Sequence, residues 1–159
     1  MPRWTSRPGV NPGRHPLSDH RGGGAHTNII RERYAHVEDL VDLGLLRLAL
    51  VVPGSVSLGP LDAEGLPMAI DLVYQNPFAD ARYMFDVCAA RNLAAHVSIF
   101  KPGFLRIGLA YHALRHLPPA KIQLYFDGEV LPFGLPPTTA SLDAYRAMLA
   151  GTGLPWMVG

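Results

Sequence analysis

Small and polar residues that could bind a ligand follow two apolar runs of the sequence. Gly54, Ser55 and Ser57 come directly after the apolar run 46–52. Small side chains let a ligand approach the backbone, and two hydroxyls can donate hydrogen bonds to a carboxylate, a phosphate or a carbonyl oxygen. Lys101 ends the next apolar run, where its ammonium group could contact an anion. A plain tight turn is the alternative explanation for the Gly–Ser segment.

Other reactive side chains have simpler explanations. His112 and His116 are four residues apart on an expected helix, a spacing that allows two imidazoles to bind one metal. They lie opposite the apolar stripe of that helix, which favours a solvated face. Cys88 falls on an apolar stripe and is interpreted as an inert core thiol. Asp127 and Glu129 follow a third apolar run, but acidic residues are common in turns.

The first 28 residues differ in composition from the rest of the chain. Residues 1–28 are rich in Gly, Pro, Arg and His, with almost no apolar periodicity. Such a segment buries too little surface to offset its ordering entropy, so we expect it to be unstructured or not a native part of the fold. His15, Asp19, His20 and His26 within it are interpreted as a consequence of composition, not as a metal site.

Elements that could position the candidate residues alternate along residues 29–159. Apolar stripes at helical spacing alternate with short apolar runs typical of buried strands. Strands are expected at residues 46–52, 96–100, 122–126 and 154–158, and residues 54–65 are expected to form a loop. Strand–helix alternation with short links predicts an α/β domain with a parallel sheet. Ligands bind such sheets beyond the carboxyl ends of the strands.

Three of the expected helices carry specific predictions. Asn76 should cap the second helix, with Pro77 as its first residue. Gly44 should end the first helix in a left-handed conformation, and Thr138 or Thr139 should cap the last. The second helix should bury Phe78, Ala81, Phe85 and Cys88, the third Ile107, Ala110, Tyr111, Leu114 and Leu117, and the last Leu142, Tyr145 and Leu149.

Composition narrows the class of protein further. Apolar residues make up 48% and charged residues 17% of 159 residues, which is typical of a globular domain. A net charge of +1 gives no reason to expect nucleic acid or an anionic membrane as partner. The single cysteine fits a reducing compartment. No apolar run approaches the ~20 residues that span a bilayer, and the N-terminus does not resemble a secretory signal. We expect a cytoplasmic protein.

Several ordered segments of the sequence resemble the β-keto acid cleavage enzymes, the family of the 3-keto-5-aminohexanoate cleavage protein. These segments occur in the family's order across roughly residues 29–159. They are RYAHVE (33–38), PGSVSLG (53–59), SIFKPGFLR (98–106), KIQLYF (121–126), FGLPPT (133–138) and GLPW (153–156).

The resemblance implies a fold, a reaction and a cofactor. The fold is a (β/α)₈ barrel, of which this chain would hold the middle βα units, truncated at both ends. The reaction converts a β-keto acid and acetyl-CoA into acetoacetate and a new CoA thioester, an acyltransferase step of catabolism. A divalent metal, usually zinc, acts as the Lewis acid, and the intact enzyme would be a homo-oligomer.

The resemblance carries over only part of the family's site. The family's zinc ligands are a His-x-His pair, absent from this sequence, and a late Glu beyond its end. The resemblance therefore implies Gly54, Ser55 and Ser57 as substrate contacts, Lys101 facing an anionic group, and residues 133–138 as part of the wall. It identifies no catalytic residue or metal ligand, and the chain alone is expected to be inactive.

Two alternatives remain open from the sequence. One is a non-catalytic α/β module that binds a carboxylate or phosphate ligand. The other is a half-barrel subunit that completes its site with another polypeptide.

Overall fold

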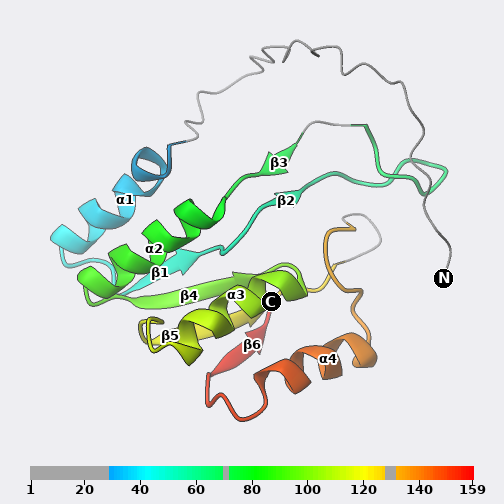
Figure 1. Ribbon diagram of the computed structural model, residues 1–159. Coiled ribbons are helices and arrows are strands. Elements are labelled where there is room, and N and C mark those ends of the chain that lie inside the picture. The colour runs from blue at the N-terminus through cyan, green and yellow to red at the C-terminus, as the bar shows by residue number, and fades with distance from the viewer. Residues whose placement is uncertain (1–28, 70–71, 128–131) are drawn as a thin grey trace, which may run out of the picture.

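The computed structural model describes residues 29–69, 72–127 and 132–159. The predictions made for residues 1–28 and for Glu129 lie outside these described residues. The described part of the chain combines helices with a parallel sheet (Figure 1). This arrangement confirms the predicted α/β class.

A four-stranded parallel sheet forms the centre of the fold. Its strand order is β1-β4-β5-β6, so the strands lie side by side in the order in which the chain forms them. Among the described residues, β1 and β6 each pair on one side only. The sheet is therefore compatible with part of a barrel but is open. Its strands are β1 (Leu48–Val51), β4 (Ala94–Ile99), β5 (Ala120–Leu124) and β6 (Trp156–Val158).

The core lies between one face of this sheet and the helices. Side chains alternate between the two faces of a strand, and the buried positions of neighbouring strands are in register: Val51, Val97 and Ile122 form one such row. A Cβ atom added to Gly108 of α3 would lie 3.8 Å from the Val97 side chain, so this row faces the helices. The helices are α1 (Ile30–Asp42), α2 (Phe78–Ala90), α3 (Pro102–Ala113) and α4 (Thr139–Leu149).

A short antiparallel hairpin leaves the carboxyl end of β1. It consists of β2 (Val56–Ser57) and β3 (Val73–Tyr74), and Val56 pairs with Tyr74. The prediction of an uninterrupted loop over residues 54–65 is therefore wrong. Val56 is buried and anchors the hairpin to the core, whereas Ser57 is exposed. Figure 1 shows the hairpin extending beyond the edge of the main sheet.

The start of α2 differs from the prediction in two respects. Pro77 takes the N-cap position and no side chain caps the helix, so Asn76 is not the cap. The Asn76 side chain is instead committed to bonds with other segments. Phe78 is 75% exposed, so it does not belong to the buried stripe, whereas Ala81, Phe85 and Cys88 are buried as predicted.

The buried face of α3 also differs from the predicted stripe. Phe104, Leu105 and Gly108 are buried, whereas Ala110 and Leu114 are exposed. Gly108 faces Val97 of the sheet, and a Cβ atom added to this glycine would still lie at an ordinary contact distance of 3.8 Å. The buried face of α3 thus includes a glycine, which a search for large apolar residues overlooks.

Other local predictions are confirmed. Gly44 has a positive φ of 71° after α1, and the Thr138 hydroxyl accepts a hydrogen bond from the Ser141 backbone at 3.2 Å at the start of α4. Tyr145 and Leu149 of α4 are buried. None of the described helices is long and apolar enough to cross a membrane.

Candidate functional site

The carboxyl ends of the parallel strands bring three of the four predicted contact residues together. Gly54 and Ser55 follow β1, and Lys101 follows β4, its neighbour in the sheet. All three line one cavity of about 660 Å³ between α2 and α3, together with Phe104 of α3. Ser57 is not among its lining residues, because it has already entered the β2–β3 hairpin.

Gly54 has a packing role in this cavity. A side chain at this position would overlap the Phe104 ring. The residue is buried, and the ring of α3 lies directly against its backbone. Glycine is therefore required here for the close approach of helix and turn, whether or not a ligand is bound.

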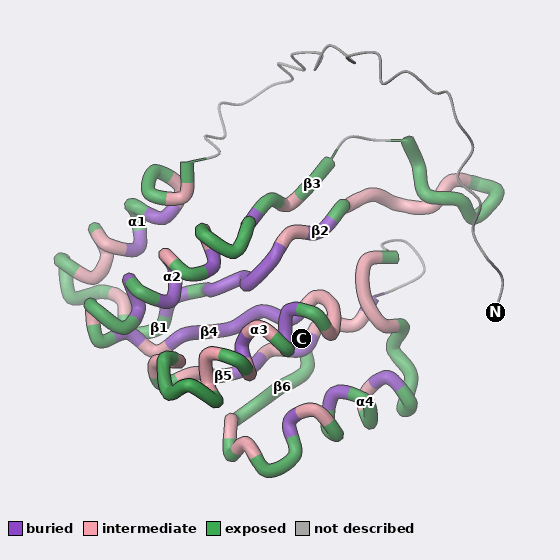
Figure 2. The backbone as a smooth tube through the Cα atoms, in the orientation of Figure 1, coloured by how far each residue is buried: buried purple, intermediate pink, exposed green. Residues whose placement is uncertain are grey.

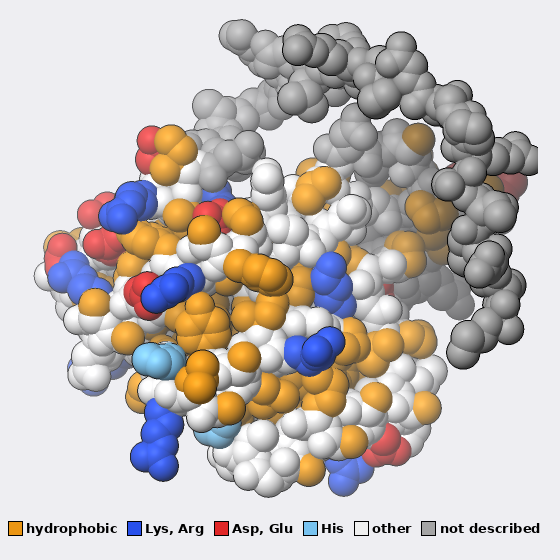
Figure 3. Space-filling view, viewed as in Figure 1, with side chains coloured by type: hydrophobic (Ala, Val, Ile, Leu, Met, Phe, Trp, Pro, Cys, Tyr) orange, Lys and Arg blue, Asp and Glu red, His pale blue; other side chains and the backbone are white. Residues whose placement is uncertain are grey.

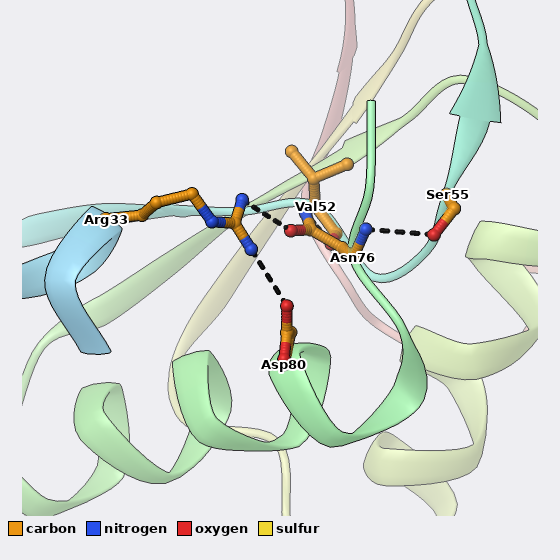
Figure 4. Close-up of polar contacts among 5 residues, drawn as sticks. All are labelled: Arg33, Val52, Ser55, Asn76 and Asp80. Atoms are coloured by element: carbon orange, nitrogen blue, oxygen red, sulfur yellow. Dashed lines mark hydrogen bonds and ion pairs between the residues drawn. The ribbon is translucent and has the colours of Figure 1, made fainter. Parts of the chain in front are cut away.

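Ser55 is held by a polar network that the sequence analysis did not identify. Its Oγ accepts a hydrogen bond from the Asn76 backbone at 2.9 Å (Figure 4). The Asn76 amide, 1% exposed, donates to the Val52 carbonyl at 3.0 Å and accepts from Arg33 at 3.0 Å. Arg33 also pairs with Asp80 at 2.8 Å. The network joins α1, α2 and the segment after β1. Among the described residues the Ser55 hydroxyl accepts one hydrogen bond and donates none.

Lys101 places a positive charge beside the cavity. Its Nζ lies 5.2 Å from the centre of the Phe104 ring, a cation–π contact. No described carboxylate lies within ion-pair distance of it. Figure 3 shows basic side chains next to the hydrophobic surface of α2 and α3. An ammonium group held in this way can bind an anion without first breaking an ion pair.

An aromatic cluster supports the carboxyl edge of the sheet. Phe100, which follows β4, contacts the rings of Tyr74, Phe104, Tyr125 and Phe133 at centroid distances of 6.3, 6.1, 5.0 and 5.5 Å. These rings come from four different segments. The cluster therefore fixes the hairpin, the start of α3 and the segment after residue 132 relative to one another.

Asp127 forms hydrogen bonds with residues 133–138, the segment predicted to form part of the wall of the site. One of its carboxylate oxygens accepts a hydrogen bond from the Gly134 backbone at 2.7 Å, and its own backbone donates to Leu135 at 2.9 Å. The other oxygen, Oδ1, is buried and has no hydrogen-bond partner among the described residues. The Gly134 backbone also lies against the Phe100 carbonyl, where a side chain would not fit. These contacts give Asp127 a structural role, since it binds the backbone of Gly134 and Leu135.

The face of the sheet opposite the core carries polar side chains that the sequence analysis did not assign to a site. His96 pairs in register with Lys121, and Ser98 with Gln123. The Nε2 atom of His96 is buried and finds no hydrogen-bond partner in the part of the chain that the structure describes. The alternation of polar and apolar residues in AHVSI and KIQL was the signal available in the sequence.

The described residues do not fit the zinc site that the resemblance implies. No group of three or more His, Cys, Asp or Glu side chains in residues 29–69, 72–127 and 132–159 is placed to hold a metal ion. His112 and His116 belong to the end of α3 and the turn after it, and His116 is exposed. Cys88 is buried in the core, and burial raises the pKa of its thiol.

The parallel sheet and the cavity at its carboxyl edge define an α/β protein whose candidate site is built by the segments that follow its strands. A model of the BKACE family, the beta-keto acid cleavage enzymes, matches residues 17–159, so the chain belongs to that family. The match confirms the resemblance stated from the sequence at the level of the family. No curated protein matches the chain.

Proposed function

We propose that this chain forms part of an enzyme that transfers the acyl group of a β-keto acid to CoA. The observation that carries the proposal is the family match over residues 17–159. In this reaction the C–C bond between the keto carbon and the CH₂–COO⁻ unit breaks. The acyl fragment passes to CoA, and the CH₂–COO⁻ unit joins the acetyl group of acetyl-CoA to give acetoacetate.

In this proposal, Lys101 and Ser55 bind the keto acid. The Lys101 ammonium receives the substrate carboxylate, because no described acidic side chain competes for it. The Ser55 hydroxyl donates to a substrate oxygen while the Asn76 backbone holds its Oγ in place. Phe104, Ile107 and Tyr111 surround the apolar part of the substrate.

Zinc and acetyl-CoA enter the proposal from the resemblance alone. The described residues supply no set of three metal ligands. The roles proposed for the residues of this chain therefore do not involve the metal. The activity proposed for this chain by itself is therefore binding of the keto acid without turnover.

Titration calorimetry with acetoacetate, the smallest stable β-keto acid, tests this proposal. We expect saturable binding that weakens about 10-fold or more in Lys101→Met, because a hydrogen bond to a charged group contributes about 1.5–3 kcal/mol. Lys121→Met is the matched control, since Lys121 lies on the opposite face of the sheet and should leave the affinity unchanged. If Lys101→Met and Lys121→Met bind acetoacetate with equal affinity, the proposed site is contradicted.

A second candidate function is a binding module for small anions in general. The unpaired ammonium of Lys101 beside a cavity favours it, because such a group binds phosphate as well as carboxylate. Phosphate that displaces acetoacetate with similar affinity would favour this module. Selectivity for the keto acid would favour the enzyme fragment.

A further inference from the structure

The cavity between α2 and α3 has room for a ligand longer than acetoacetate. Its volume of about 660 Å³ falls within the range of pockets that hold drug-sized molecules, about 300–1,000 Å³. Acetoacetate is a much smaller molecule and would occupy only part of this space. The side chains that line the rest of the cavity therefore indicate what else its ligand carries.

A second cationic side chain lines this cavity. Lys101 directly precedes α3, and Arg106 lies in the second turn of the helix. Figure 2 shows that buried and exposed segments alternate along α3, and Arg106 is one of its exposed residues. Among the described residues, no acidic side chain lines the cavity and no carboxylate pairs with Arg106. Two unpaired positive charges favour a ligand with two negative charges.

Two helix N-termini add to the positive potential at this place. The helix α2 begins at Phe78 and α3 at Pro102, and both Phe78 and Gly103 line the cavity. The first amides of a helix have no partner within the helix and carry partial positive charge. A Cβ atom added to Gly103 would meet no described atom within 4 Å, so a ligand can approach this backbone. These groups reinforce Lys101 at one end of the cavity.

The two cationic residues are separated along α3. Arg106 follows Lys101 by five residues, which corresponds to about 7.5 Å along the helix axis at about 1.5 Å per residue. The remaining lining is largely apolar and includes Phe104, Ile107 and Tyr111. This arrangement fits two anionic groups at the ends of a short apolar chain better than two charges on a single phosphate group.

We infer that the keto acid bound by this chain is a dicarboxylate, whose second carboxylate ends a short apolar chain. The Lys101 ammonium and the first amides of α3 receive one carboxylate. The Arg106 guanidinium binds the other, since its planar donors match the two oxygens of a carboxylate. This inference rests on the proposed function, because it places the keto acid in the same cavity.

Titration calorimetry of the full chain at low ionic strength tests the inference with adipate and its monomethyl ester. The two probes share one carbon chain and differ by one negative charge, and both lack the keto group. We expect wild type to bind adipate about 5-fold more tightly, because a charge-assisted pair with an exposed arginine contributes modestly. Added salt should reduce this preference.

Variants at the two cationic positions should separate their roles. Arg106→Met should bind adipate and the ester with equal affinity and leave the affinity for the ester unchanged, whereas Lys101→Met should weaken the binding of both. Arg106→Lys should retain part of the preference for adipate. Arg115→Met is the matched control and should retain all of it, because Arg115 is also exposed but lines a different cavity.

Equal affinity of wild type for the two probes would overturn the inference, and so would a preference for adipate that persists in Arg106→Met. Acetoacetate distinguishes these failures from a failure of the proposed function. If acetoacetate binds through Lys101 while adipate has no advantage over its ester, only the dicarboxylate inference is wrong. If acetoacetate does not bind, the proposed function is wrong and the inference fails with it.

Discussion

Asn76 connects α1 with the segment that follows β1 at the candidate site. Its amide contacts the end of β1 and α1, and its backbone holds Ser55. Sequence analysis assigned it to a helix cap, because an Asn before Pro at the start of a helix has that role in many proteins. The cap role was wrong, because buried partners more than 20 residues away leave no periodic signal in the sequence.

Asn76→Ala tests the importance of this network for stability. We expect a loss of about 2–3 kcal/mol in the free energy of unfolding, because the Val52 carbonyl and an Arg33 donor lose their buried partner. Urea denaturation followed by circular dichroism measures the loss. Gln75→Ala, at the exposed neighbouring position, is the control and should cost less than about 0.5 kcal/mol. A similar loss for both variants would show that the network contributes little.

Ser55→Ala should affect both binding and stability. The hydroxyl accepts a bond from the Asn76 backbone, so its removal should cost about 0.5–1.5 kcal/mol of unfolding free energy. In a complete family enzyme that carries the same Gly–Ser turn, the lost hydrogen bond to the substrate should reduce kcat/KM by about 10- to 150-fold. Ser141→Ala, in the first turn of α4, should retain near-normal turnover. Unchanged kcat/KM for a folded Ser55→Ala enzyme would make the turn purely structural.

At the scale of elements, the apolar spacing within a segment predicted those helices and strands that depend on that segment alone. The helices α1 and α4 and the four parallel strands follow from apolar spacing within each segment. The β2–β3 hairpin was missed because two residues have no period and their partners are distant in the chain. Ser57 was placed in the site on the assumption of a loop, and the hairpin carries it away from the cavity.

The packing of α4 against the end of β5 gives a prediction about pH. Tyr145 is buried against Phe126, and its hydroxyl has no hydrogen-bond partner within residues 29–69, 72–127 and 132–159. Burial raises the pKa of Tyr145 from 10.0 to about 12. The raised value means that the folded state holds the proton more tightly than the unfolded state. Its contribution is therefore fully present below pH 10 and is lost as the pH rises toward 12.

Tyr145→Phe should stabilise the fold and reduce this pH dependence. Removing an unpaired buried hydroxyl should add on the order of 1 kcal/mol at neutral pH. The difference between variant and wild type should widen as the pH rises above 10. Urea denaturation at pH 7 and at several values above 10 measures both effects. A variant that is less stable at pH 7 would indicate that the hydroxyl has a partner in solution.

At the scale of the whole molecule, the sequence predicted the parallel sheet and the edge at which ligands would bind. That edge brings Gly54, Ser55 and Lys101 to one cavity because β1 and β4 are parallel neighbours. The opposite face of the sheet, with His96, Lys121 and Gln123, follows from the pairing register, which becomes visible only when the strands are paired in space. Short strands with polar residues at alternate positions gave a weaker signal of this second face.

The most direct test of the proposed function is to identify the backbone amides whose NMR signals shift when a β-keto acid is added. Amide NMR spectra of the isotope-labelled chain, titrated with acetoacetate, should show saturable shifts concentrated at Gly54, Ser55, Lys101 and the first turn of α3. The Lys101→Met variant should lose these shifts while its remaining spectrum stays that of the folded protein. Shifts that do not saturate, or that concentrate at Lys121 and its neighbours on the opposite face of the sheet, would contradict the account.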